Sequence, residues 1–116
     1  MQYIDLNIIT QNDILGHWKV SDRTLSNNAE DKFSNVTNIV LNNTTYSTDN
    51  GIYTGKLTMI RETKIIYNPQ LKFFDNSSEV ASAIITRLKR DKKGIDDVYE
   101  LTLYFSHGLE LVLLKN

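Results

Sequence analysis

Hydrophobic and polar residues alternate along most of the chain, which is the pattern of half-buried β-strands. The clearest alternation covers residues 98–105, where every second residue from Tyr99 onward is leucine or aromatic. Residues 14–20 alternate in the same way and place Trp18, the only tryptophan, on the face opposite His17. The pattern predicts strands over residues 14–20, 36–41, 44–48, 53–59, 64–67, 80–89, 98–105 and 109–114, with a short apolar segment over 70–75.

Turn-forming residues separate these predicted strands. Asn, Asp and Gly tolerate the backbone angles of tight turns, which predicts turns at 42–43, 49–51, 91–94 and 106–108. Arg61 and Glu62 are expected to form another turn. Asn68 and Pro69 should end a strand, because proline cannot donate a hydrogen bond to a central ladder. Residues 21–34 are polar and read as a long loop that covers one end of the fold or is mobile.

Helix is an alternative at one place only. Residues 79–84 have the propensity of a helix, but the β-branched residues that follow and the turns on both sides suit a strand that pairs with residues 98–105. We therefore predict a strand there. Short turns are expected near residues 10–15.

Seven or eight short strands joined by tight turns predict an all-β domain with an antiparallel meander. The length of 116 residues is that of a single domain covering 1–116, with residues 1–12 as an N-terminal extension or edge segment. A meander must hide its edge strands, and closure into a small barrel does so completely. A β-sandwich is the alternative.

The opening strand carries a more specific signal. An N-terminal Leu-Gly-x-Trp-Lys-Val around Gly16 and Trp18, at the head of such a meander, resembles the lipocalin-like or calycin group. That group includes lipocalins, fatty-acid-binding proteins, avidins and small bacterial lipocalin-like domains. The resemblance implies that Gly16 lets the first strand bend and that Trp18 plugs the closed end of a barrel. It also implies a basic residue near the final strand, packed over the tryptophan, for which Lys115 is the candidate.

Composition and charge narrow the possible functions. The net charge of −1 gives no electrostatic reason to bind nucleic acid or an anionic membrane. The absence of cysteine excludes thiolate metal sites and cysteine nucleophiles. No apolar run is long enough to span a membrane, and residues 1–12 do not read as a signal peptide. These features favour a cytoplasmic protein over an exported one whose leader has been removed.

Catalytic and metal-binding patterns are weak. His17 should point away from the core, and His107 lies beside Ser106 in a turn, where neighbours rarely reach nucleophile geometry. Adjacent acids at 30–31 and 96–97 lack the alternating spacing of a calcium loop. We therefore predict no enzyme, no metal and no cofactor. Basic residues at 87, 89, 90, 92 and 93 have no aromatics between them and suit a soluble strand end, or a docking patch for an acidic partner.

Binding is the predicted class of function. The first hypothesis is a small apolar ligand held inside the barrel near Tyr53, Met59 and Tyr99, where apolar walls meet amphipathic side chains. The alternative is a protein–protein module, such as an intracellular inhibitor or immunity-type protein that neutralises its partner. An enzyme on this frame is the least favoured hypothesis.

The last strand is predicted to be covered on both faces. Leu111 and Leu113 share one face of this strand, and Val112 and Leu114 share the other. A strand with two apolar faces is normally covered on both. The cover for the outer face is either residues 3–9 or a second subunit, which would form a homodimer through this strand.

Overall fold

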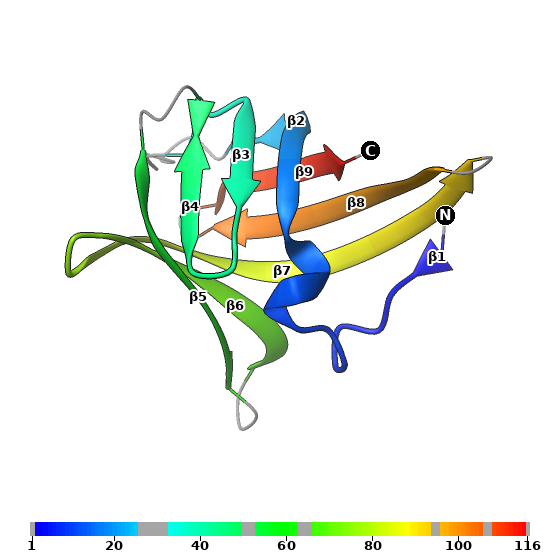
Figure 1. The fold of residues 1–116 in the computed structure, drawn as a ribbon, viewed down its shortest axis with the longest axis horizontal. Coiled ribbons are helices and arrows are strands. Elements are labelled where there is room, and N and C mark those ends of the chain that lie inside the picture. The colour runs from blue at the N-terminus through cyan, green and yellow to red at the C-terminus, as the bar shows by residue number, and fades with distance from the viewer. Residues whose placement is uncertain are drawn as a thin grey trace.

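The structure is a computed structural model that describes residues 2–25, 33–49, 53–62, 66–93, 96–105 and 108–115. The side chains of residues 62, 66–67, 92–93 and 96 lie outside this description. The chain forms a strongly curved antiparallel sheet with one turn of 3-10 helix, η1 (Gln11–Ile14) (Figure 1). The strands are β1 (Gln2–Tyr3), β2 (Gly16–Thr24), β3 (Asn38–Leu41), β4 (Thr45–Thr48), β5 (Thr54–Glu62), β6 (Ile66–Asp75), β7 (Ser78–Lys93), β8 (Asp96–Phe105) and β9 (Glu110–Lys115).

The strands close into an eight-stranded barrel. Each strand from β2 to β9 pairs with the next one along the chain, and β9 also pairs with β2. Every pairing is antiparallel, so the barrel is an up-and-down meander without a free edge between its first and last strands. The predicted all-β class and barrel are thus confirmed, and the sandwich alternative does not apply.

The alternating residues of the strands pack together inside the barrel. Trp18 is completely buried, as the alternation predicted, and its indole Nε1 donates a hydrogen bond of 2.9 Å to the carbonyl of Ile14 in η1. His17 points outward and is exposed. The side chains with no exposed surface are Ile14, Trp18, Phe33, Ile39, Leu41, Leu71, Phe73, Ala83, Ile85, Leu101, Leu103, Phe105, Leu109, Leu111 and Leu113.

Strand β2 is longer than predicted. Residues 21–24 were expected to belong to the long loop, but they continue the strand to Thr24. The side chains of Ser21, Asp22 and Thr24 are exposed, and the partly buried Arg23 donates to the carbonyls of Ser34 and Val36. The backbone of these residues pairs with β9 after a register shift between Val20 and Asp22. Pairing with a neighbouring strand therefore overrides the polar composition here. Residues 26–32 of the predicted loop lie outside the described residues.

Three predicted breaks between strands were also wrong. The predicted turn at 91–94 does not begin at Asp91, because β7 continues to Lys93 and pairs with β8 there. Strand β5 continues through Arg61 and Glu62, and β6 runs through Pro69 without ending. The proline lies where the register shifts, between the pairs Ile60–Gln70 and Glu62–Ile66, so no regular ladder position needs its missing N–H.

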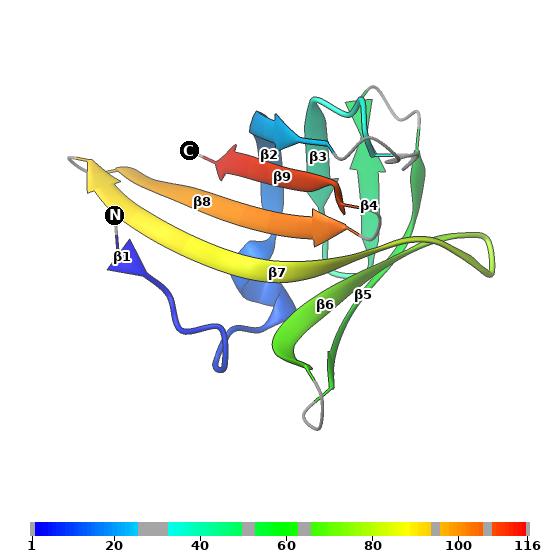
Figure 2. The same ribbon diagram turned by 180° about the vertical axis from the view of Figure 1, so that it is seen from behind.

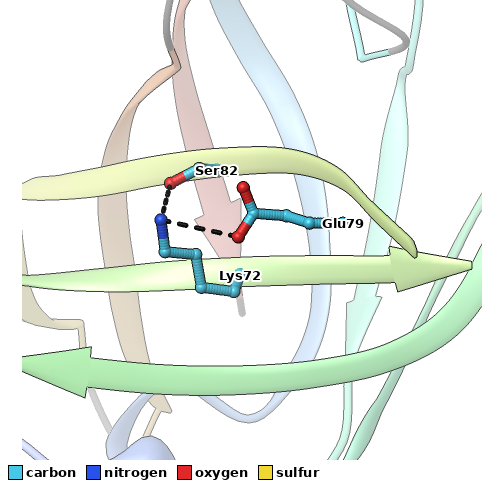
Figure 3. A network of polar contacts seen from close by, with 3 residues as sticks. All are labelled: Lys72, Glu79 and Ser82. Carbon is cyan, nitrogen blue, oxygen red and sulfur yellow. Dashed lines mark hydrogen bonds and ion pairs between the residues drawn. The ribbon is translucent and has the colours of Figure 1, made fainter. Parts of the chain in front are cut away.

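The segment with helical propensity is a strand, as predicted. It belongs to β7, which has 16 residues and crosses the whole molecule (Figure 2). On the outer surface Lys72 of β6 joins the two strands of the β6–β7 hairpin. Its ammonium group donates to the Ser82 hydroxyl at 3.0 Å and lies 3.6 Å from the Glu79 carboxylate (Figure 3).

The N-terminal segment lies along β7. Gln2 and Tyr3 pair with Arg90 and Lys89, and the N–H of Ile4 donates to the carbonyl of Leu88. The expectation that residues 3–9 cover the outer side of the last strand was therefore wrong. Short turns near residues 10–15 are confirmed by η1, which leads the chain from this segment into β2.

Candidate functional site

One end of the barrel interior is filled by aromatic rings. The Phe33 ring lies 4.8 Å from the Phe73 ring and 5.0 Å from the Phe105 ring, centroid to centroid. The Tyr46 ring lies 4.9 Å from Phe73, and the exposed fraction of all four side chains is at most 2%. The end of the predicted loop does cover this end of the fold. The alternation pattern does not identify Phe33, although a single phenylalanine in a polar stretch is a signal of a ring that inserts into the core.

Lys115 lies over Trp18 near the other end, as the resemblance implied. Its ammonium nitrogen is 4.9 Å from the centroids of both the Trp18 and Tyr99 rings, so the two rings hold the charge by cation–π attraction. It also donates to the carbonyl of Leu15 at 2.6 Å. Gly16 has a φ of 132°, and a Cβ there would lie 2.6 Å from Lys115 Cδ, so this contact requires glycine.

A row of three side chains crosses β7, β8 and β9 at this end. Arg90 pairs with Tyr99, and Tyr99 pairs with Lys115. A parallel row two residues deeper in the barrel consists of the buried residues Leu88, Leu101 and Leu113. Because side chains alternate along a strand, Arg90, Tyr99 and Lys115 continue the inward-facing side of the sheet past the hydrophobic core.

The row borders a pocket of about 420 Å³. Among the described residues, Arg90 and Lys115 have no carboxylate within ion-pair distance. Asp13 also borders the pocket, but its carboxylate accepts hydrogen bonds from the backbone N–H and the hydroxyl of Thr10, at 2.6 and 3.3 Å. Burial lowers the pKa of the Lys115 ammonium below its ordinary value of 10.5. The pocket lining consists of Ile4, Asn12, Asp13, Arg90, Tyr99 and Lys115.

The three predicted ligand-binding residues are all partly buried against the core. Tyr53 lies at the Phe33 end, where the two ring centroids are 6.3 Å apart. Tyr99 lies at the Lys115 end, about 20 Å along β8 from Phe105 by the rise of a strand. Met59 lies on β5 opposite Leu71. The structure thus assigns Tyr53 and Tyr99 to different ends of the barrel, and their shared role in binding one ligand stays a prediction.

The outer surface holds a second, polar pocket over β2, β3 and β4. It has a volume of about 390 Å³ and is bordered by His17 and Asp49, among others. Partial burial raises the pKa of the Asp49 carboxyl, but hydrogen bonds from the backbone N–H groups of Thr37 and Asn38 and from the Thr37 hydroxyl outweigh it and lower that pKa below 3.8. Asp49 therefore fastens the start of β3 to the end of β4.

The sequence predicts no metal site and no catalytic site, but the structure describes only some of the residues on which this prediction rests. Within the described ranges, no group of three or more His, Asp or Glu side chains lies close enough to hold a metal ion. His107, the acids at 30–31 and the side chain of Asp96 lie outside those ranges. Non-catalytic function therefore stays a prediction.

Four apolar side chains lie on the outer face of β7, β8 and β9, between polar neighbours such as Glu110 and Glu100. Ile84 pairs with Tyr104, and Val112 pairs with Thr102 beside it. The exposed fraction is 42% for Tyr104 and 36% for Leu114. We call Ile84, Tyr104, Val112 and Leu114 the outer strip. The two-sided apolar pattern predicted for the last strand is therefore present, because Leu111 and Leu113 are buried on its inner face.

Two further results complete the description of these sites. No helix in the described part of the chain has the length and apolar character needed to cross a membrane. Comparison of the chain with protein-family models, with curated proteins and with solved structures gave no match.

Proposed function

We propose that this chain is a non-catalytic binding protein on a calycin-like barrel, and that it recognises a protein partner with its outer surface. An inhibitor or immunity-type protein that neutralises its partner is a module of this kind. The observation that carries the proposal is the filled interior. At the end of the barrel interior near Tyr53, Phe33 already packs against Phe73 and Phe105.

The outer strip supports a protein partner. Tyr104 and Leu114 are large apolar side chains that remain exposed on a regular, rigid sheet. Exposed apolar residues gathered on one face mark protein–protein interfaces, and tyrosine is enriched at the points that contribute most to binding. The homodimer predicted through the C-terminal strand would use the same strip, and the mass of the partner separates it from a different protein.

A native mass spectrum of the protein purified from its own host tests the proposal. We expect a co-purifying polypeptide, since burial of Tyr104 and its neighbours removes apolar surface from water. The variant Tyr104→Ser should lose it. The control is Tyr3→Ser on β1, where the exposed fraction of the tyrosine is 68%, compared with 42% for Tyr104. Tyr3 pairs with Lys89, which is five residues along β7 from the Ile84 that pairs with Tyr104, so this variant should keep the partner.

The outcomes divide clearly. A polypeptide that is lost with Tyr104→Ser and kept with Tyr3→Ser supports the proposal. An uncharged apolar small molecule bound to the wild-type chain would instead support the hypothesis of a ligand near Tyr53, Met59 and Tyr99. Recovery of the bare chain alone, or of a polypeptide that both variants keep, contradicts the role of the outer strip.

A further inference from the structure

We propose that the barrel end formed by Arg90, Tyr99 and Lys115 binds a carboxylate group carried on a short apolar body. This site is separate from the outer strip, because its three side chains project from the inward-facing side of the strands. The proposal therefore stands or fails independently of the protein partner proposed above.

The arrangement of charges is the first argument. Arg90 and Lys115 flank Tyr99 in one row, and neighbouring strands are about 4.8 Å apart, so the backbones carrying the two cations are about 10 Å apart. Neither cation has an acidic partner among the described residues. Two like charges at one end of a sheet repel each other, and an anion between them removes that cost.

The hydrogen-bonding capacity of the two cations is the second argument. Lys115 uses one donor on the carbonyl of Leu15, which leaves two of its three N–H groups. Arg90 presents a planar fork of donors, whose geometry matches the two oxygens of a carboxylate. Asp13 also borders the pocket, and Thr10 donates only to its Oδ2, so Asp13 keeps its negative charge. The two cations outnumber this one carboxylate, and the ligand carboxylate would bind between Arg90 and Lys115.

The rest of the pocket determines what carries the carboxylate. Ile4 and the Tyr99 ring provide an apolar wall beside the cations. The volume of about 420 Å³ lies within the usual range for small-molecule sites. A free organic acid with a short chain fits this chemistry, and so does the carboxyl end of a polypeptide. Both sources share the group that the site would recognise.

Trp18 supplies the readout for a test. It is the only tryptophan, and the Lys115 ammonium lies 4.9 Å from its ring, so a ligand that draws on Lys115 should change the tryptophan emission. The probes are hexanoate, hexan-1-ol as the uncharged analogue, and acetyl-trialanine with either a free or an amidated C-terminus. We expect saturable binding of at least one acid, with a Kd on the order of 1 mM, and none of hexan-1-ol or the amide. Tighter binding of hexanoate indicates a free acid, and tighter binding of the peptide acid indicates a polypeptide end.

Variants on β7 make the test specific. Arg90→Gln changes an exposed side chain and should weaken binding of the acid at least about tenfold, as expected for a lost charged hydrogen bond. The matched control Arg87→Gln, on the same strand and outside the pocket lining, should bind like the wild type. Circular dichroism should show both variants folded. No saturable response to either acid up to about 0.1 M, or equal binding by Arg90→Gln and the wild type, overturns the proposal.

Discussion

Trp18 and Phe33 show how single side chains fill this barrel from two ends. Trp18 is held on three sides, by its hydrogen bond to the carbonyl of Ile14, by the Lys115 ammonium and by the core. Phe33 is surrounded by rings from four other parts of the chain, namely Tyr46, Tyr53, Phe73 and Phe105. A large buried side chain of this kind stabilises the fold because its apolar surface leaves water. Its close contacts also favour one packing arrangement of the core.

Replacement of Trp18 should therefore be costly. Trp18→Ala should lower the free energy of unfolding by about 3–5 kcal/mol, because it removes the largest buried side chain and leaves a cavity. That is a large part of the roughly 5–15 kcal/mol that typically stabilises a domain. Urea denaturation followed by circular dichroism measures the loss. His17→Ala is the matched control. His17 is next to Trp18 in β2 but points outward, so its replacement should change the free energy of unfolding by no more than about 0.5 kcal/mol. A loss below about 1 kcal/mol for Trp18→Ala would show that the tryptophan is peripheral.

The sequence could predict the role of Trp18 but not that of Phe33. Alternation with His17 and Lys19 is sufficient to place Trp18 on the inner face of its strand. Phe33 has no such neighbours, because it precedes β3 in an irregular segment and reaches the core only through the tertiary fold. The row of Arg90, Tyr99 and Lys115 could not be predicted either, since its register depends on two strand pairings of distant residues.

Strands were predicted well in kind and less well in extent. The predicted strands correspond to strands of the structure, except that residues 66–67 and the predicted segment 70–75 form one strand, β6. Strands β2, β5, β6 and β7 continue past the residues expected to end them. In each case a neighbouring strand accepts the backbone hydrogen bonds, and the register shifts accommodate the irregular residues. The polarity of the residues predicts which side chains are exposed to water. The end of a strand depends instead on backbone hydrogen bonds to the neighbouring strand, which composition does not predict.

Asp49 makes one of these element boundaries sensitive to pH. Its carboxylate accepts hydrogen bonds from Thr37 and joins the start of β3 to the end of β4. Because folding lowers the pKa of Asp49 below 3.8, its contribution is fully present above that value and is lost as the pH falls through the folded-state pKa. Asp49→Ala should lower the free energy of unfolding by about 1 kcal/mol near neutral pH.

Urea denaturation at several pH values measures this effect. The difference between Asp49→Ala and the wild type should shrink as the pH is lowered below about 4, because the wild-type carboxylate becomes protonated. A difference that stays constant down to about pH 2 would show that the negative charge of Asp49 does not matter.

At the scale of the whole molecule, the barrel has a core packed with its own side chains and several different candidate binding surfaces around it. Closure through β9 and β2 brings the inward side chains together in one hydrophobic core. Figures 1 and 2 show the course of the curved strands. The exterior carries the outer strip, the polar pocket beside Asp49 and the cationic row at one end. Alternation predicted this architecture, but only the packing of rings decides whether such a barrel is open or full.

The central claim is that side chains of the chain itself fill the hydrophobic core of the barrel, and that binding takes place on the outer strip and at the Lys115 end, beyond that core. The most direct test is a fluorescence titration with N-phenyl-1-naphthylamine, an uncharged apolar probe that becomes bright in apolar cavities. Phe33→Ala is the positive control, because loss of the ring opens apolar space between Phe73 and Phe105. We predict no saturable binding to the wild-type protein and measurable binding to Phe33→Ala. One-to-one binding to the wild-type protein with a Kd on the order of 1 μM would contradict the account and restore the interior as the functional site.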